Sequence, residues 1–417
     1  MSPGTDIILS MSHDHDYSFE SVPRDKRKSF VSMFFVMLGF TFFSASMSVG
    51  ATLGNGLDLK GFVVAVLAGS AILSCYTGLL GFIGCSTGMS FDLLARHAFG
   101  SFGSYISSAI ITLTQIGWFG VGVAMFSNSA SEVLNISPVI IMLIIGACMT
   151  TSAYFGIRGM EIISYISVPL IAILGIYSMV TATNAGGGLN AIFNQNAGSL
   201  TIIQSIGLVI GSFVAGGTTT PNFTRYAATR KTAVITTVIA FFIGNILMFS
   251  FGAVGGAMTG KDDIFYVMMA QGLIVPALIV LGANIWTTND NTLYNAGLGL
   301  SNITKFPKRP LVIVSGVIGT LASIWIYNYF VTWLTILNGA LPPIGTVLIV
   351  DYFLHRKDYE NDNVPRFRIT NIISIIAGAA VGLLVKVGIS SINAMVVSGL
   401  LCFVLNLVTK KIRKAND

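Results

Sequence analysis

The sequence predicts an all-α polytopic membrane protein with twelve transmembrane helices, and three observations carry that prediction. Of the 417 residues, 53% are hydrophobic and only 10% are charged, whereas a soluble fold has about 25% charged residues. The apolar residues fall into runs of roughly 20, the length that spans a bilayer as a helix. Nearly all Lys and Arg residues lie on one side of the arrangement that these runs define. The composition excludes a water-soluble enzyme, a nucleic-acid-binding module and a disordered protein.

Apolar runs separated by polar breaks set the expected spans. Spans nine and ten are separated only at Tyr327 and Asn328, and spans eleven and twelve only at Ser390 and Ser391. In order, the twelve runs are 30–53, 61–85, 102–127, 137–156, 161–183, 201–219, 233–257, 272–298, 310–326, 329–352, 370–389 and 391–409.

The basic residues predict the orientation. With the N-terminus in the cytoplasm and twelve alternating spans, 20 of the 23 Lys and Arg residues fall in cytoplasmic segments. Only Lys60, Lys261 and Lys386 fall on the other side. This asymmetry satisfies the positive-inside rule, so we expect a multi-pass protein of the inner (plasma) membrane with both termini cytoplasmic. The stretch from His13 to Asp16 offers metal-binding side chains, but a solvated acidic tail is the favoured interpretation.

Two spans turn from large apolar residues to small and polar ones partway through. Span one does so between Gly39 and Gly54, and span six does so at Gly216-Gly217, shortly before Pro221. Pro and paired Gly disfavour a continuous helix, and lipid does not satisfy freed backbone groups, so a broken helix must line a cavity. The sequence therefore predicts broken helices 1 and 6.

The two broken spans stand five spans apart and start on opposite sides of the membrane. That placement indicates two inverted five-helix repeats followed by two C-terminal helices, with a binding site at the repeat interface. The expected divisions are a cytoplasmic tail (1–29), a first repeat (30–183), a second repeat (184–352), a cytoplasmic loop with two C-terminal helices (353–409) and a cytoplasmic tail (410–417).

Polar and aromatic residues at mid-span depth indicate the ligand. Gln115 and Trp118 are three apart in span three, and Ser212 and Phe213 precede the break in span six. Asn284 lies in span eight. A carboxamide presents a donor beside an acceptor and pairs with the edge of a heterocyclic base, while aromatic faces stack on flat rings. We expect a small, flat, neutral, amide-like heterocycle. The alternative is that these amides bond between helices among core aromatics.

Span eight also suggests a cation. The hydroxyls of Thr287 and Thr288, together with carbonyls freed in span one, would form a neutral all-oxygen site suited to Na⁺. Asp290 is the one acidic residue well inside a span, which marks it as functional; it would tune the potential or itself carry a proton. The sequence has no nucleophile elbow, P-loop or zinc-binding helix, so we do not expect an enzyme.

At these motifs the chain resembles the bacterial cytosine permeases of the nucleobase–cation symport family, which share the leucine-transporter-like fold. The matching stretches are Phe35–Met47, Thr114–Phe126 and Gly282–Tyr294. The resemblance implies a base pocket with Gln115 and Asn284 at the polar edge of the base, Trp118 and Phe213 on its faces, and Ser212 and the backbone near Phe43 completing it. It implies sodium held by Thr287, Thr288 and main-chain carbonyls near Gly39, Phe42 and Asn284.

One departure concerns Ala215, where these permeases carry a serine, so a hydroxyl is missing from the pocket wall. The expected function is sodium-coupled import of a nucleobase by alternating access, with cytosine the leading substrate. Two alternatives remain: a proton-coupled carrier of purines or related heterocycles that uses Asp290, and a membrane sensor that binds a base without moving it. We expect the base and membrane lipid as partners, with no nucleic acid and no obligate protein partner.

Overall fold

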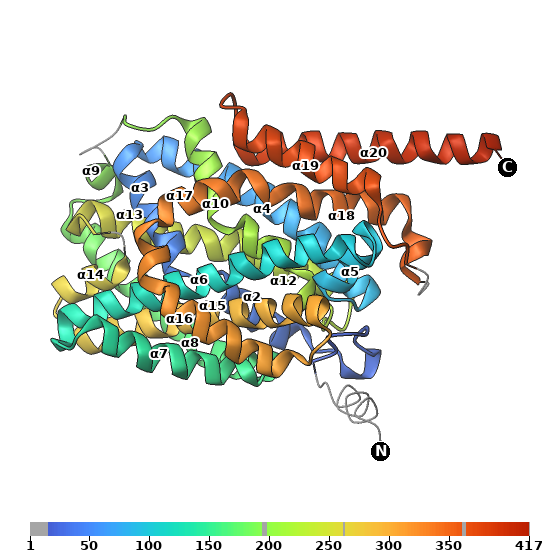
Figure 1. Ribbon diagram of the computed structural model, residues 1–417. Helices are drawn as coiled ribbons and strands as arrows, with labels where there is room; N and C mark the ends of the chain where they lie inside the picture. Colours follow the sequence, from blue (N-terminus) through green and yellow to red (C-terminus); the bar gives the residue numbers. More distant parts are fainter. Residues whose placement is uncertain (1–15, 194–197, 262, 361–363, 417) are drawn as a thin grey trace, which may run out of the picture.

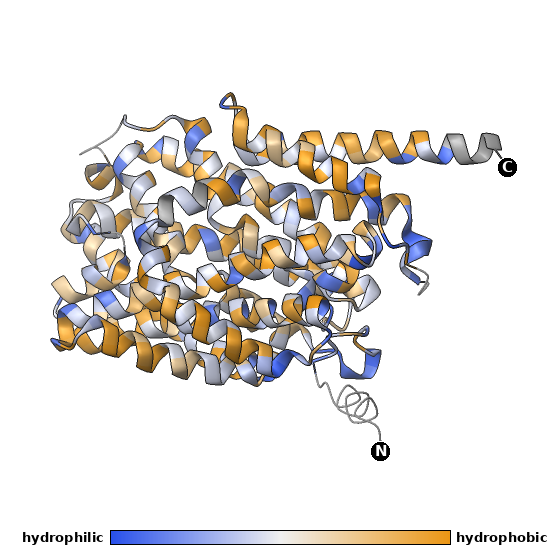
Figure 2. Ribbon diagram, viewed as in Figure 1, coloured by the Kyte–Doolittle hydropathy of each residue, from blue (hydrophilic) through white to orange (hydrophobic). Residues whose placement is uncertain are grey.

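The computed structural model describes residues 16–193, 198–261, 263–360 and 364–416. Across these ranges the chain is built from helices that run side by side in one bundle (Figure 1). Apolar residues cover the long sides of the bundle, and hydrophilic residues gather at the end where the N-terminal segment and the end of α20 lie (Figure 2). That distribution is typical of a bundle whose sides face lipid.

A helix or a helix pair covers each of the twelve expected spans. In order they are α2 with α3 (Phe30–Thr41, Ser44–Gly56), α4 (Leu59–Thr87), α6 (Gly103–Leu134), α7 (Pro138–Tyr154), α8 (Ile157–Ala185), α10 with α11 (Ile202–Thr218, Pro221–Thr224), α12 with α13 (Arg230–Ile239, Asn245–Thr259), α15 (Ile274–Thr304), α16 (Lys308–Asn328), α17 with α18 (Phe330–Ala340, Pro342–Leu354), α19 (Ile369–Leu384) and α20 (Ser390–Asn416). Short helices α5 (Phe91–Phe99), α9 (Leu189–Phe193) and α14 (Ile264–Ala270) connect them.

Seven helical segments in the described part of the chain are long and apolar enough to cross a membrane individually, and the bent pair α2–α3 makes an eighth. Helices α7, α10 and α19 are apolar but have only 10–17 residues. Helix α15 is long, with a polar stretch from Asn284 to Asn291. The spans that fail a simple test of length and hydropathy are therefore short or carry polar residues.

The first span is broken as expected. Helices α2 and α3 meet at an angle of 55°, and Phe42 and Phe43 between them are extended (φ −77°, ψ 93° and φ −140°, ψ 132°). The amide of Phe42 still donates to Leu38 O, and the helical pattern resumes when Ser46 N–H donates to Phe43 O. Carbonyls near the end of α2 are thereby released from helical pairing.

Span six is interrupted at Pro221, one of the two features that predicted the break, and not at the glycine pair. Gly216 and Gly217 lie inside α10, which continues to Thr218. The chain then tightens, because Thr219 N–H donates to Gly216 O and Thr220 N–H to Gly217 O, each three residues back. Pro221 begins α11, where its missing N–H is tolerated. The proline, rather than the glycine pair, therefore sets the break.

Span ten has a break that the sequence analysis did not predict, since 329–352 was expected to be continuous. Helix α17 ends at Ala340 and α18 begins at Pro342. A proline inside a helix clashes with the carbonyl four residues back and leaves it without a backbone donor. That carbonyl belongs to Asn338, and the Ser391 hydroxyl of α20 donates to it at 3.0 Å. The C-terminal hairpin thus satisfies a backbone group that the break exposes.

Glycines allow α3 and α13 to pack with their backbones in contact. A Cβ atom on Gly252 would lie 1.8 Å from Met47 O, and one on Gly50 would lie 2.2 Å from Phe249 O. Close approach through small residues is the usual means of holding membrane helices together.

Gly252→Ala should therefore destabilise the protein. Overpacking costs about 1–3 kcal/mol, which outweighs the roughly 0.5–1 kcal/mol that alanine gains over glycine in a helix. We expect a lower thermal unfolding midpoint in detergent. Gly207→Ala is the matched control, because its nearest neighbour, an Ile389 methyl, would lie 3.5 Å away. An unchanged midpoint for Gly252→Ala would contradict this packing.

Candidate functional site

A small cavity lies beside the break in span one. Its empty volume is about 260 Å³, and it is lined by Phe40, Phe43, Gln115, Trp118, Ser212, Phe213, Gly216, Thr288 and Thr292. Five of the six residues expected to bind the base therefore share one cavity, although they come from three separate spans. The sequence analysis did not identify Phe40 or Thr292, which look like ordinary core residues of their helices, and it singled out Gly216 only for the predicted break in span six.

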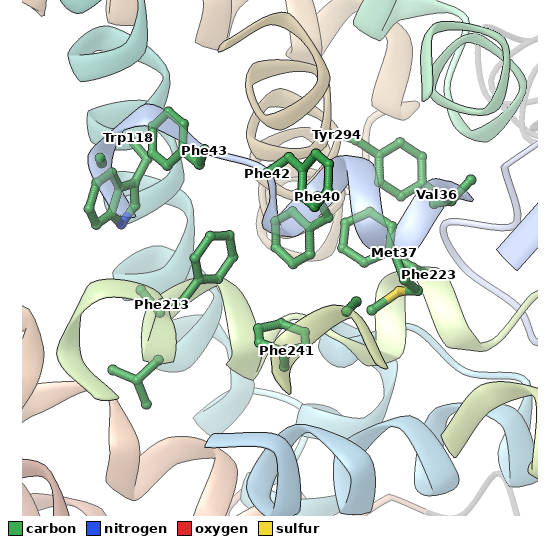
Figure 3. Close-up of a cluster of buried hydrophobic side chains, with 14 of the residues drawn as sticks. Val36, Met37, Phe40, Phe42, Phe43, Trp118, Phe213, Phe223, Phe241 and Tyr294 are labelled. Atoms are coloured by element: carbon green, nitrogen blue, oxygen red, sulfur yellow. The ribbon is translucent and has the colours of Figure 1, made fainter. Parts of the chain in front are cut away.

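Aromatic rings form the walls of this cavity (Figure 3). The Phe43 ring lies 5.7 Å from the Trp118 ring at 71°. The Phe213 ring lies 5.2 Å from the Phe40 ring at 87°. The Trp118 ring also contacts the Trp333 ring of α17, with 5.0 Å between the ring centroids and 61° between the ring planes. These edge-to-face contacts hold the rings in place, so the walls are preformed.

The Gln115 carboxamide is the main polar group of the cavity. Its side chain is 1% exposed, and neither its Nε2 nor its Oε1 has a hydrogen-bond partner among the described residues. Leaving buried polar atoms unpaired costs about 1–3 kcal/mol each. Ser212 donates its hydroxyl proton to Val209 O, so its oxygen remains an acceptor. A donor and an acceptor at Gln115 are thus available to a planar polar ligand.

Asn284 lies near the cavity but does not line it. Its Oδ1 accepts a hydrogen bond from the Ser44 hydroxyl of α3 at 2.9 Å. Its Nδ2 lies 3.5 Å from the Met248 sulfur. The side chain therefore joins α15 to the start of α3, just beyond the break.

Four backbone carbonyls surround the Thr288 hydroxyl. Its Oγ1 lies 3.0 Å from Phe42 O, 3.4 Å from Phe40 O, and 3.5 Å from Gly39 O and Asn284 O. A hydroxyl donates one proton, so it does not satisfy all four acceptors at once. Such an excess of oxygen lone pairs at a helix break suits a bound cation.

Thr287 is placed beside this cluster. Its hydroxyl donates to the carbonyls of Ala283 and Asn284, both at 3.0 Å. The Asn284 carbonyl is therefore shared between the two threonines. Each expected sodium ligand therefore lies in or next to one all-oxygen cluster. The described residues hold no group of three or more His, Cys, Asp or Glu side chains that could bind a metal ion.

Asp290 faces away from the cavity. It is fully buried, and its Oδ1 accepts a hydrogen bond from the Ser152 hydroxyl of α7 at 2.6 Å. The indole N–H of Trp286 donates to the same hydroxyl at 2.7 Å. Asp290 Oδ2 has no hydrogen-bond partner among the described residues.

The N-terminal segment 16–28 packs across one end of the bundle, which corrects the interpretation of Asp16 as part of a solvated tail. The Asp16 carboxylate pairs with Lys308 Nζ at 2.5 Å, and both side chains are buried. The Asp16 carbonyl accepts from Arg225 Nη2 at 2.6 Å and from Tyr226 OH at 2.9 Å. His13, Asp14 and His15 lie outside the described residues.

Arg225 is fully buried beneath this segment. Its guanidinium also donates to Tyr17 O at 2.7 Å and to Tyr294 OH at 2.8 Å. Arg225, which follows the break in span six, is thus bonded to Tyr294 of α15. Through Asp16 it is also connected to Lys308 of α16. The sequence placed Arg225 in a loop and contained no signal that it is buried, because its partners are backbone groups and distant tyrosines.

Comparison with known proteins identifies the family. The family model described as permeases for cytosine/purines, uracil, thiamine and allantoin matches residues 21–406. The chain belongs to this family. The cytosine permease of Escherichia coli (strain K12) is 44% identical over 405 residues, which cover 96% of each chain. The hydantoin permease of Microbacterium maritypicum is 23% identical over 71% of this chain and 66% of its own.

Solved structures confirm the fold class of this permease family member. Mhp1, a nucleobase-cation-symport-1 family transporter in a closed conformation with bromovinylhydantoin bound, superposes with a TM-score of 0.80 at 18% identity, covering 94% of this chain and 95% of Mhp1. A Na⁺-coupled sialic acid symporter gives 0.71 at 15% identity, covering 97% of this chain and 94% of its own. The chain is a multi-pass membrane transporter and not an enzyme.

The unpaired amide of Gln115 predicts how a substitution there changes the stability of the transporter without ligand. Gln115→Leu removes two unsatisfied buried atoms with little change in volume, so the unfolding midpoint without ligand should stay level or rise. Ser107→Ala, which removes a hydroxyl bonded to Ser104 O on the same helix, serves as the control and should not rise. A clear drop for Gln115→Leu would mean that the amide has partners in the empty state.

Proposed function

We propose that this transporter imports a nucleobase, with cytosine the leading substrate, together with Na⁺. The observation that carries the proposal is the pairing of two adjacent sites. An unpartnered carboxamide lies inside an aromatic cavity, and an excess of carbonyl oxygens lies at the helix break beside it. Thr288 belongs to both, since it lines the cavity and sits among the carbonyls.

In the proposed base site, Gln115 pairs with the amide-like edge of the ring. Trp118 and Phe213 cover its faces, and Ser212 accepts a hydrogen bond from it. Such stacking is worth about 1–3 kcal/mol for each stacked base. The 44% identity to the Escherichia coli cytosine permease over nearly the whole chain supports a nucleobase. Ala215, buried in α10, leaves cytosine less firmly supported than a nucleobase in general.

Asn284 has a proposed role in joining the two sites. For its amide to reach the edge of the base, it must turn from Ser44 when the base enters. Its own carbonyl, which faces Thr288, stays with the ion. A base that moves the side chain and an ion that holds the backbone would then stabilise the same conformation of α15, which is the physical basis of coupled binding.

The proposed sodium site uses the hydroxyls of Thr287 and Thr288 and the carbonyls of Gly39, Phe42 and Asn284. Moving one positive charge with a neutral base gains about 2.3 kcal/mol per 100 mV. At 1.36 kcal/mol for each factor of ten, this corresponds to roughly 50-fold accumulation of the base from the voltage alone.

Alternating access requires that the cytoplasmic side of the transporter close and open. We propose that the segment 16–28 closes that side. The assignment places both termini in the cytoplasm, in line with the distribution of Lys and Arg. The side chain of Asp16 is held by α16, whereas its carbonyl is held by Arg225, after the break in span six. Separating α16 from the residues that follow the break in span six would therefore break the contacts of Asp16.

A proton-coupled carrier of purines is the second candidate, and the buried carboxylate of Asp290 would carry its proton. The carboxylate bonds to Ser152 rather than to a cavity residue, which favours sodium. Uptake that persists without sodium and stops in Asp290→Asn would favour the proton. A membrane sensor that binds a base without moving it would not exchange labelled base across the membrane of proteoliposomes.

Thr288→Val tests the ion site. The substitution keeps the shape of the side chain but removes its oxygen, so half-maximal uptake of radiolabelled cytosine should need at least tenfold more sodium. Uptake at saturating sodium should largely persist. Thr304→Val is the matched control, because Thr304 is exposed near the end of the same helix, and its hydroxyl donates to Leu300 O and accepts from Phe306 N–H, away from the proposed ion site. The same sodium dependence in both variants would rule out Thr288 as a ligand.

Asp16→Asn tests the cytoplasmic closure. Cys85 is 2% exposed, and Arg27 of the segment donates to its carbonyl at 2.9 Å. In a background with the other three cysteines replaced by alanine, maleimide should label Cys85 roughly tenfold faster or more in Asp16→Asn, because unpairing a buried ion pair costs several kcal/mol.

Asp25→Asn is the control for this labelling experiment. Asp25 lies in the same segment, but its side chain is exposed and pairs only with the neighbouring Lys26. Its labelling rate should match that of the parent. Equal rates for Asp16→Asn and Asp25→Asn would contradict a closing role for the segment.

A further inference from the structure

Two grooves open on the lipid-facing surface on either side of the end of α7. One groove, with an empty volume of about 1080 Å³, runs between α7 and α8 and is lined by Cys148, Thr151, Ser152, Phe155, Arg158 and Trp286 among others. The second, of about 1100 Å³, runs between α7 and α16. Thr151 and Phe155 line both, so the two grooves share a rim.

The grooves are lined mainly by apolar residues. Ile162 of the first groove is 53% exposed, and Leu143, Val317 and Leu321 of the second are 52%, 52% and 74% exposed. Helices α8 and α16, which form their outer walls, are each long and apolar enough to span a membrane. Lipid chains are therefore the surroundings that these surfaces meet, and two neighbouring grooves match the two chains of one phospholipid.

A guanidinium stands at the same end of each groove. Arg158 lines the first groove, is exposed, and has no ion pair among the described residues. Arg309 lies over the ring of Tyr154, 5.3 Å from its centre, and Tyr154 lines the second groove. A guanidinium binds phosphate through two parallel hydrogen bonds, and basic pockets between membrane helices at the cytoplasmic side bind anionic headgroups.

We propose that the two grooves form a site for one anionic phospholipid of the cytoplasmic leaflet, with its phosphate at Arg158 and its acyl chains on either side of Phe155. The choice of leaflet rests on the orientation proposed above. The hydroxyl of Thr151, on the shared rim, lies between the two chains. The excess positive charge at the groove ends makes an anionic lipid the occupant rather than a zwitterionic one.

The floor of the first groove connects the lipid to the transport helix. Ser152 and Trp286 both line it, and Ser152 bonds to Asp290 of α15. Helix α15 also carries Thr287 and Thr288. An acyl chain in the groove covers the Ser152–Trp286 contact and keeps water from the buried carboxylate, so the lipid stabilises the packing of α7 and α8 against α15.

The test compares the full-length protein in nanodiscs of phosphatidylcholine alone and of phosphatidylcholine with phosphatidylglycerol. Phosphatidylglycerol should raise the unfolding midpoint of the wild type, and native mass spectrometry should retain about one phosphatidylglycerol in preference to phosphatidylcholine. Arg158→Ala should weaken that preference at least tenfold and abolish the shift in midpoint. Neither readout requires transport, so their failure is distinguishable from failure of the proposed function.

Two further variants complete the test. Arg356→Ala replaces an exposed arginine that lines neither groove, and it should keep both the shift and the bound lipid. Thr151→Trp, with Arg158 intact, should lose the bound lipid because the indole fills the shared rim. An equal preference for phosphatidylglycerol in wild type and Arg158→Ala, or retention of phosphatidylcholine alone, would overturn the proposal.

Discussion

The convergence of four carbonyls on the Thr288 hydroxyl is the constraint on which the rest of the site depends. Asn284 O belongs to α15 itself. The other three carbonyls reach Thr288 because the chain leaves the helix at Phe42 and Phe43, which turns the last carbonyls of α2 toward α15. In lipid those groups would be left without partners. The break is therefore tolerated only against a helix that offers a hydroxyl there, and the same turn places Phe43 at the wall of the aromatic cavity.

This geometry explains why the base and the ion are proposed to travel together. Each site is incomplete on its own: Gln115 lacks a partner in the cavity, and one hydroxyl proton is shared among several carbonyls at the break. In the proposed coupling, filling either site would hold α2, α3 and α15 in one arrangement. Farther along α15, Tyr294 accepts a hydrogen bond from Arg225, which also donates to the Asp16 carbonyl, so the proposed closure by the segment 16–28 would act on α15 as well.

Much of this was predictable from residue pattern, because polar residues in a membrane span have few reasons to be there. The choice of Gln115 and Thr288 as candidates, and a break between Gly39 and Gly54, follow from that argument. The break at Leu341 was missed although Pro342 and Pro343 signal it. Its partner for the freed carbonyl, Ser391, is remote in sequence and was not predictable from the span. Burial of Arg225 was missed since its partners are backbone carbonyls and tyrosines on other elements, and Asn284 pairs with Ser44, a contact that spacing along a helix does not reveal.

Binding of the base and of sodium should be reciprocal, and titration calorimetry of the purified transporter measures this directly. The account predicts that the dissociation constant for cytosine falls at least tenfold between sodium-free and sodium-saturated buffer, and that saturating cytosine lowers the dissociation constant for sodium by the same factor. A cytosine affinity that is equal in sodium and in choline would contradict the account, because the two sites would then not share the broken helix.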